Sequence, residues 1–511
     1  MVHSKQIKRV LIVGGGSAGW LTAGILAAAH KNKLEISLIE SANIGTIGVG
    51  EGTWPTMRET LRKIGITEGE FIQQCDASFK QGSEFINWAS SVDHAYYHPF
   101  SLPVGFEQGI DMVTPWLAVH DKVDFAHAVC AQAYWCDESK APRLPSDIQF
   151  GGKGNYGYHL NADKFAKLLK RHCINELGVK LVLDDVHEVI SLSDGDIRAV
   201  KTLQNVELEA DLFIDCTGSR SLLLGKHYGI SWLSQKHVLQ NDRAIAVQVP
   251  HADERAPVAS CTKSTGQPHG WIWDIALPTR RGIGYTFASN HCDFDIAKQQ
   301  LSNYISEQGL EVSKENTFKE IHFNPGYREK FWHNNCLAIG MSAGFLEPLE
   351  ASALVMIELS ASYLSDNFPS TRSLMNVVAS RFNAKFNYRW QRIIDFLKLH
   401  YVLSTRDDTP YWQQMRSEHI PQSLQELLLL WQYQAPKSTD LDRIDEVFSA
   451  ASYQYVLYGM GFLPSNYEPT LNQDSASLFK QVTQNAQRGL GVLPTNRDLL
   501  TNVAKFGIPT I

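Results

Sequence analysis

The sequence lacks several features that would define a specialised class of protein. Its eight cysteines include no C-x-x-C pair, so we expect neither a structural zinc site nor a disulfide framework, and a reducing cytoplasm fits best. No run of about 18 apolar residues could cross a membrane, and no signal-peptide stretch precedes the first predicted strand. The formal net charge of -7 does not favour nucleic acid or an anionic membrane as a partner.

Length and composition leave room for a large globular protein. The 511 residues can fill several cores or one large discontinuous architecture. Hydrophobic residues make up 44% and charged residues 20% of the chain, as in ordinary globular proteins. The 12 tryptophans and 23 phenylalanines could line an aromatic pocket.

A glycine-rich turn near the start predicts a dinucleotide-binding site. The apolar run Val10–Val13 precedes glycines in the spacing G-x-G-x-x-G, and helix-forming residues follow at 21–29. Glycines let the backbone turn sharply and approach a pyrophosphate, while the N-terminus of the helix offers N–H donors. The plainer alternative is a tight turn without a ligand. The nucleotide would contact Gly14, Gly16, Ser17, Ala18 and Gly19.

Two later strands refine this prediction towards FAD. The stretch "LEISLIE" ends at Glu40, 21 residues after Gly19, where a carboxylate can accept a hydrogen bond from a ribose hydroxyl. Only one glycine fingerprint is present, and no redox C-x-x-C accompanies it. The segment Glu209–Leu224 resembles the second nucleotide-contacting strand of flavin monooxygenase-like proteins, which favours FAD over NAD.

The stretch "GWIWDIALP" at residues 270–278 raises a separate question. In a strand, Trp271 and Trp273 would share one face, and few polar residues alternate with them, which predicts burial on both faces. On its own this pattern is typical of a core strand with two bulky side chains. The alternative is a wall in which two rigid indoles separate one cavity from another.

Six stretches follow one another in a consistent order over nearly the whole chain: "GVGEGTWP" (48–55), "FKQGSEFINW" (79–88), "GWIWDIALP" (270–278), "GMSAGFLEPLEASAL" (340–354), "HYVLSTRDDTPYW" (400–412) and "GMGFLP" (459–464). Together they resemble the flavin-dependent tryptophan halogenases. The resemblance implies an α/β (α+β) fold, with a flavin monooxygenase-like, Rossmann-type FAD-binding module, a substrate-side β-sheet and a helical C-terminal part. We expect the discontinuous core in residues 1–400, and in residues 401–511 a mainly helical subdomain that covers the substrate site.

The resemblance also implies a reaction. A two-component halogenase uses FAD as FADH2 together with O2 and chloride or bromide, and a separate NAD(P)H flavin reductase supplies the reduced flavin. Hypohalous acid would pass through a tunnel to Lys80, beside a small indole-type aromatic substrate. A buried ammonium can activate this acid, whereas a neutral amine could form a haloamine, so both protonation states remain open. The alternative for Lys80 is an ordinary solvated lysine.

Glu350 matches the second catalytic residue of the family. It could polarise the halogenating species or accept the ring proton. The plainer reading is a carboxylate that stabilises a helix start after Pro348, and both roles can hold together. Glu347 is offset by three residues and is the weaker candidate.

Further roles follow from the resemblance alone. The backbone amides of Ser352 and Ala353 would bind halide, and Trp271 and Trp273 would form the tunnel wall. No metal site is expected. The additional FAD contacts would be Gly48, Gly50, Glu51, Val186, Met341 and Leu354.

The sequence departs from the family pattern at three places. Pro278 comes two residues later than usual, a shift that preserves which face each strand residue occupies. Residues 351–353 read Ala-Ser-Ala instead of Ser-Thr-Gly, which leaves the halide preference open. Tyr453 is followed by Gln454 rather than by a second tyrosine, so no clamp for the zwitterion of free tryptophan is evident. Indole, another small aromatic or a larger indole-bearing molecule is equally plausible as substrate.

Two rival functions remain at this point. A flavin hydroxylase on the same scaffold needs its substrate against the flavin, which Lys80, Glu350 and the tryptophan pair argue against. A non-catalytic flavin-binding protein or sensor would have no open path between the flavin and Lys80. The sequence leaves open the regioselectivity and the oligomeric state, for which a homodimer is possible.

Overall fold

The computed structural model describes residues 5–43, 45, 51–312, 317–465, 471 and 473–510. Its first sheet has six strands in the order β20-β21-β12-β1-β2-β8. The central strand β1 pairs in parallel with β12 and β2, and four of its five residues are buried, as is typical of a parallel sheet covered on both faces. The strands are β1 (Arg9–Val13), β2 (Glu35–Glu40), β8 (Lys180–Leu183), β12 (Leu212–Asp215), β20 (Trp332–His333) and β21 (Cys336–Ala338).

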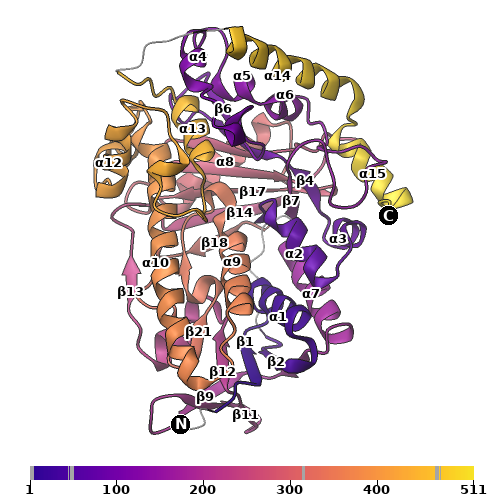
Figure 1. The fold of residues 1–511 in the computed structure, drawn as a ribbon, viewed down its shortest axis with the longest axis vertical. Coiled ribbons are helices and arrows are strands. Elements are labelled where there is room, and N and C mark those ends of the chain that lie inside the picture. The colour runs from indigo at the N-terminus through magenta and orange to yellow at the C-terminus, as the bar shows by residue number, and fades with distance from the viewer. Residues whose placement is uncertain are drawn as a thin grey trace.

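Three helices pack together beside this sheet. The helix α1 (Ser17–His30) follows the glycine turn and contacts both α7 (Ala162–Asn175) and α9 (Ser352–Asp366). Figure 1 shows α1, β1, β2 and β12 gathered at one end of the molecule. The Rossmann-type module predicted from the strand, glycine turn and helix is therefore confirmed.

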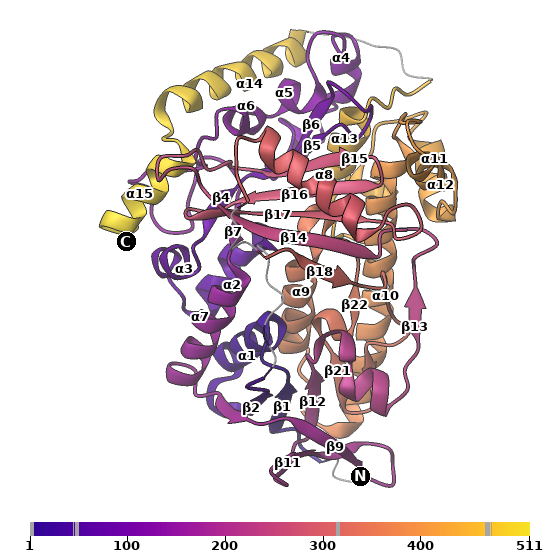
Figure 2. The same cartoon turned by 180° about the vertical axis from the view of Figure 1, so that it is seen from behind.

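A seven-stranded sheet lies across the middle of the molecule, in the order β18-β14-β17-β16-β15-β5-β6. Its strands pair antiparallel except β15 with β5. Figure 2 shows α8 (Phe294–Glu307) lying over this sheet. The strands are β5 (Gly82–Ile86), β6 (Ala95–Pro99), β14 (Arg243–Pro250), β15 (Thr262–Gln267), β16 (Gly270–Ala276), β17 (Arg280–Phe287) and β18 (Lys319–His322).

Three small sheets complete the β-structure. The sheet β3-β7-β4 holds Lys80 at the end of its last strand, and the others have the orders β11-β10-β9 and β13-β19-β22. The strands are β3 (Glu51–Gly52), β4 (Ser78–Lys80), β7 (Gly157–Leu160), β9 (Val186–Ser191), β10 (Ile197–Thr202), β11 (Glu207–Glu209), β13 (Trp232–Ser234), β19 (Gly326–Arg328) and β22 (Gly344–Phe345).

Helices make up the described elements after β22, as predicted for the C-terminal part. The yellow α14 lies along the end of the molecule opposite β1, where it contacts α5 and α6 (Figure 1). The helices not yet given are α2 (Thr56–Ile64), α3 (Glu68–Gln74), α4 (Val113–Leu117), α5 (Phe125–Val129), α6 (Ala131–Asp137), α10 (Arg372–Val402), α11 (Pro410–Ser417), α12 (Gln422–Leu430), α13 (Ala450–Gly459), α14 (Gln473–Val492) and α15 (Asn496–Phe506).

One apolar core reaches from Ile7 near the start of the chain to Val503 in α15, and a smaller one lies between α8 and its sheet. The long helix α10 continues through residue 400 and ends at Val402. Residues before and after 400 thus contribute to the same core, and the division of the chain at this position stays a prediction.

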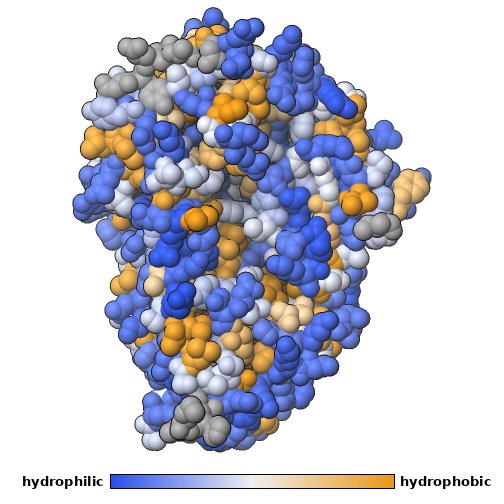
Figure 3. Space-filling view, in the orientation of Figure 1, coloured by the Kyte–Doolittle hydropathy of each residue, from blue (hydrophilic) through white to orange (hydrophobic). Residues whose placement is uncertain are grey.

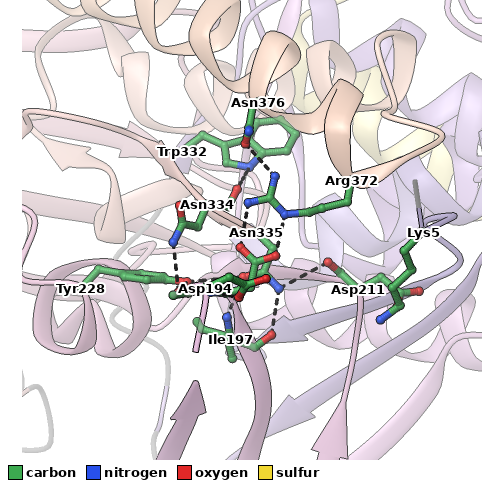
Figure 4. Close-up of polar contacts among 12 residues, drawn as sticks. Lys5, Asp194, Ile197, Asp211, Tyr228, Trp332, Asn334, Asn335, Arg372 and Asn376 are labelled. Carbon is green, nitrogen blue, oxygen red and sulfur yellow. Dashed lines mark hydrogen bonds and ion pairs between the residues drawn. The ribbon is translucent and has the colours of Figure 1, made fainter. Parts of the chain in front are cut away.

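A buried asparagine fastens β10 to the six-stranded sheet (Figure 4). The side chain of Asn335 accepts a hydrogen bond from the Ile197 N–H at 2.9 Å and donates to the Ile197 carbonyl at 2.8 Å. Arg372, at the start of α10, donates to both carboxylate oxygens of Asp196 at 2.5 and 2.7 Å. These contacts join the end of the molecule near β9 to the helical part.

The face seen in Figure 3 is mostly hydrophilic, with apolar side chains scattered over it. None of the described helices combines the length and apolarity needed to cross a membrane. Within the same residues, no three histidine, cysteine, aspartate or glutamate side chains are arranged to hold a metal ion. All eight cysteines are buried free thiols.

Candidate active site

The glycine turn leaves open backbone where a pyrophosphate would approach. Gly14 has a φ of +115°, and a Cβ there would lie 2.2 Å from the Cys216 carbonyl oxygen. A Cβ on Gly19 would lie 1.9 Å from the Gly14 carbonyl oxygen, whereas nothing lies within 4 Å of one on Gly16. Gly16 is also the N-cap of α1, and no side chain caps this helix end. The turn therefore fits a dinucleotide phosphate bound at a helix N-terminus.

Glu40 ends β2 beside this turn, as predicted. Its Oε2 accepts a hydrogen bond from the Trp20 indole N–H at 3.0 Å, and its Oε1 pairs with Lys170. A Cβ on Gly15 would lie 1.9 Å from the Glu40 carboxylate. The carboxylate is thus fixed against the glycine turn, and its contact with a ribose stays a prediction.

Asp215 holds together the loop that follows β12. It is fully buried, and its Oδ2 accepts hydrogen bonds from the N–H groups of Leu223 and Leu224, both at 2.9 Å. Its Oδ1 accepts one from the Ser342 hydroxyl at 3.1 Å. The sequence indicated that the end of β12 contacts the nucleotide. The structure adds that Asp215 also holds the segment that contains Met341, through its bond to Ser342.

A cavity of about 240 Å³ lies between the two large sheets and α9. Its lining includes Gly340, and a Cβ on Gly340 would lie 2.8 Å from the Ala18 Cβ, so the cavity adjoins the glycine turn. Val186 and Leu354 do not line it, and Gly48 and Gly50 lie outside the described residues. The predicted site residues that line it are Glu51, Lys80, Trp271, Trp273, Met341, Glu350, Ser352 and Ala353.

Lys80 is 1% exposed, so the alternative of a solvated surface lysine is wrong. Burial lowers the pKa of its ammonium to about 8, although the nearby charge of Glu350 raises it. Its Nζ lies 5.3 Å from the centroid of the Phe100 ring, and no described side chain or backbone carbonyl accepts a hydrogen bond from it. A Cβ on Gly52 would lie 3.0 Å from this Nζ, so glycine at position 52 leaves room for it.

Glu350 faces the same cavity between two histidines. His98 Nδ1 lies 2.7 Å and His400 Nε2 lies 3.4 Å from its Oε1. Burial alone would raise the pKa of Glu350, but the two imidazoles outweigh it and hold this pKa below its ordinary value. The carboxylate is therefore ionised over the working pH range.

The backbone at Glu350 is strained. Glu350 and Ala351 have φ values of 63° and 54°, in the left-handed region that is costly for residues other than glycine. The Trp54 indole N–H donates to the Glu350 carbonyl at 2.8 Å and holds this conformation. A short 3-10 helix, Leu349–Ala351, begins after Pro348 and contains Glu350, so the expected helix start is present, and α9 follows with Ala351 as its N-cap.

Ser352 and Ala353 are the first residues of α9, and both line the cavity. The N-cap Ala351 makes no side-chain capping hydrogen bond. The first N–H groups of α9 have no partner within the helix, and the helix dipole is positive at this end, so the geometry suits a small anion. Halide binding here stays a prediction.

The two tryptophans share one face of β16, as predicted, and their ring centroids lie 6.3 Å apart. Every residue of β16 is buried. Trp273 pairs in register with Gly284, where a Cβ would lie 2.1 Å from the indole ring. The strand ends at Ala276, so the later proline leaves the facing of both indoles unchanged. The strand is therefore a core strand that also borders the cavity, and the role of the two indoles as a tunnel wall stays a prediction.

Sequence reasoning missed His98 and His400. They come from β6 and α10, far apart in the sequence, and neither has a metal-type or catalytic spacing to other residues. The only signal for His400 was its place as the first residue of the family-like stretch at 400–412. Only the tertiary structure brings both imidazoles to Glu350.

At residues 453–455, where the sequence shows no clamp for an amino-acid zwitterion, the side chains are engaged in contacts within the protein. Tyr453 is buried and packs on Phe396, with ring centroids 5.0 Å apart. Gln454 donates to the Pro436 carbonyl at 2.9 Å, and the Tyr455 hydroxyl donates to the Ser101 carbonyl at 2.9 Å. These side chains serve the packing of α13.

Comparisons with known proteins identify the family of this chain. The family model described as tryptophan halogenase matches residues 9–476. The tryptophan 6-halogenase SttH of Streptomyces toxytricini is 31% identical, over 94% of this chain and 95% of its own. The tryptophan 7-halogenase RebH of Lentzea aerocolonigenes is 30% identical, over 92% of both chains. The crystal structure of a tryptophan halogenase from Shewanella frigidimarina superposes with a TM-score of 0.94 and 50% identity, over 99% of both chains.

Proposed function

The chain belongs to the tryptophan halogenase family, and from this premise we propose that it halogenates an indole-type or other electron-rich aromatic carbon beside Lys80. It is an enzyme of the flavin-dependent halogenase class, and this class is favoured over the hydroxylase alternative. The observation that carries the site assignment is the single cavity that joins Lys80 and Glu350 to the start of α9 and to Met341.

The glycine turn would hold the FAD phosphates through the open backbone at Gly16 and the free N–H groups of α1. When bound in its reduced form, FAD supplies hypohalous acid from O2 and chloride or bromide. The first N–H groups of α9 would hold the halide. We propose as further FAD contacts Gly14, Ser17, Ala18, Gly19, Glu40, Gly48, Gly50, Glu51, Val186, Met341 and Leu354.

Lys80 and Glu350 divide the work at the other end of the cavity. The Lys80 ammonium donates a hydrogen bond to hypohalous acid and makes its halogen more electrophilic. Glu350 keeps its negative charge because two imidazoles face it, so its role is to stabilise positive charge on the aromatic ring. A carboxylate with a lowered pKa is a weak base, and this favours electrostatic stabilisation over proton abstraction.

The substrate is an indole or a similar small aromatic rather than a tightly held zwitterion. This proposal rests on the Gln454 amide and the Tyr455 hydroxyl, whose polar groups already bond to backbone carbonyls. The relatives named above act on tryptophan, so free tryptophan is the competing substrate.

The test combines the purified protein with a flavin reductase, FAD, NADH, and bromide or chloride. Indole, tryptophan and a tryptophan-containing peptide serve as substrates, and mass spectrometry detects the products. We expect brominated or chlorinated indole to exceed halogenated tryptophan, and Lys80→Ala to abolish both. Hydroxylated product without halogenated product would overturn the proposed function, and preferential halogenation of free tryptophan would overturn the substrate assignment.

The setting of the reaction is part of the proposal. A separate NAD(P)H-dependent flavin reductase is needed, because no second glycine fingerprint offers a nicotinamide site. Eight free, buried thiols fit a reducing cytoplasm. A homodimer stays a prediction, and neither nucleic acid nor a membrane is expected as a partner.

A further inference from the structure

The carboxylate of Glu347 is the hub of a hydrogen-bond network behind the tryptophan pair. Glu347 is 1% exposed, and its Oε2 accepts a hydrogen bond from the Trp271 indole N–H at 2.6 Å. The same oxygen accepts one from the Asn241 amide at 2.7 Å and one from the Tyr401 hydroxyl at 2.9 Å. Three donors therefore converge on one buried carboxylate that borders the cavity.

This network connects separate parts of the fold. Trp271 lies on β16, Tyr401 on α10, and Asn241 in the loop before β14. The Tyr411 hydroxyl of α11 extends the network by donating to Asn241 Oδ1 at 3.0 Å. A buried carboxylate with three donors resists movement of any of them, because each lost hydrogen bond leaves a desolvated polar group without a partner.

The two indoles of the wall are held by different means. The Trp273 ring lies over Gly284, and no described group accepts a hydrogen bond from its indole N–H. Trp271 has a neighbouring ring, Trp88, at a centroid distance of 5.9 Å, but its only polar anchor in the described structure is Glu347. Removing the carboxylate should therefore free one indole and leave the other in place.

We propose that Glu347 is the positioning residue that keeps the Trp271 indole across the cavity and so keeps the aromatic substrate on the Lys80 side. The inference rests on the proposed halogenase function. Glu347 also lies only three residues before Glu350, and Pro348 stiffens the segment between them. The anchor of the wall and the carboxylate beside Lys80 thus belong to one short, rigid stretch.

The test compares Glu347→Gln with the wild type in two readouts. The first is the ratio of hydroxylated to halogenated product, which should rise about tenfold when the charged acceptor of the Trp271 N–H becomes a weaker, neutral one and substrate reaches the flavin side. The second uses the ligand-free protein with 15N-labelled tryptophan, in which hydrogen exchange of the Trp271 indole N–H should speed up about tenfold. The Trp273 signal should not change.

Two tryptophan variants test the hydrogen bond between Trp271 and Glu347 by changing its donor, and they replace Glu347→Gln if that variant does not fold. Trp271→Phe removes the bonded N–H and should raise the product ratio, whereas the matched Trp273→Phe removes an N–H without a described acceptor and should raise it less. Adding Glu347→Gln to Trp271→Phe should produce no further rise.

The outcomes separate the inference from the function on which it rests. Absence of halogenation by the wild type would overturn the proposed function. A wild type that halogenates, with an unchanged product ratio in Glu347→Gln and unchanged Trp271 exchange, would overturn the inference alone. An effect of Glu347→Gln that is equally large in the Trp271→Phe background would also overturn it, because the carboxylate would then act through another group.

Discussion

Two buried lysines, Lys80 and Lys398, form a matched pair in this molecule. Each is 1% exposed, and burial lowers the pKa of each ammonium to about 8. Lys398, within α10, donates hydrogen bonds to the Met415 and Val238 carbonyls at 2.7 and 3.2 Å. Lys80 has no such acceptor among the described residues and borders the cavity instead.

Neither burial nor a shifted pKa identifies a functional lysine. Both lysines share these properties, but the polar head of Lys398 is satisfied by backbone carbonyls and ties α10 to α11 and to the loop before β14. The Lys80 ammonium has N–H donors that no described group accepts, and it lines the cavity of about 240 Å³. Unused donors that face a cavity, and not the pKa, distinguish the proposed catalytic lysine from the structural one.

The largest expected difference between the two lysines is in turnover. Lys80→Met should lower the halogenation rate by at least about 100-fold, because the activating ammonium is lost. Lys398→Met should keep the rate per folded molecule within about threefold, since this residue touches neither the cavity nor Glu350. Single-turnover assays with bromide and indole, normalised to folded protein, measure both. Equal losses in the two variants would remove the distinction.

Lys80→Met should lower the halogenation rate but raise the stability of the folded protein. The Lys80 pKa falls from 10.5 to about 8 on folding, so the charged form costs the folded state up to about 3 kcal/mol below pH 8. This cost disappears as the pH rises past 10.5, where the lysine is neutral in both states. Lys80→Met should therefore raise the free energy of unfolding at pH 7, and it should have little effect on this free energy near pH 10.5.

Urea unfolding at pH 7 and pH 10 measures this effect. The free energy of unfolding should rise less in Lys398→Met than in Lys80→Met, because Lys398→Met also removes two hydrogen bonds worth about 1 kcal/mol each. A lower free energy of unfolding for Lys80→Met at pH 7 would contradict the idea that the site stores an unfavourable buried charge.

The pH dependence of the rate tests which form of Lys80 reacts. If the ammonium donates to hypohalous acid, the rate should fall by roughly tenfold per pH unit above its pKa of about 8. The profile of Lys398→Met should keep the fall that titration of Lys80 causes, because the Lys398 ammonium does not line the cavity. A rate that rises through this range would assign the reaction to the neutral amine.

The smallest expected effect concerns the support of the Lys80 strand. The Asn496 side chain, fully buried at the start of α15, donates to the Phe79 carbonyl at 3.0 Å. Asn496→Ala should lower the free energy of unfolding by about 1–2 kcal/mol and the halogenation rate a few-fold, with little change in KM. Lys505→Ala, an exposed change on the same helix, is the control. An unchanged rate would show that β4 holds Lys80 without α15.

Much of the site could be predicted because it depends on residues that are close together in the sequence. The strand, glycine turn and helix around Gly14 follow from backbone sterics, and the facing of Trp271 and Trp273 follows from the two-residue period of a strand. The resemblance to a family pointed to Lys80 and Glu350, which line one cavity here. Glu347, three residues away, was considered only as a weaker catalytic candidate.

The rest could not be read from neighbouring residues. The partners of Glu350 come from β6 and α10, and those of Glu347 come from β16, α10 and the loop before β14. No spacing in the sequence signals such contacts, because they arise between segments 50 or more residues apart. For the same reason nothing local to Lys398 predicts that two carbonyls occupy its ammonium.

Short-range geometry and the two-residue period of a strand were enough to define the nucleotide turn and the facing of the Trp271 and Trp273 indoles, and the family resemblance implied the helical C-terminal part. The tertiary structure alone decided which buried charges are satisfied and which remain available. It did so because burial and hydrogen-bond partners are properties of segments brought together by folding, and these set the charge state and the freedom of each side chain.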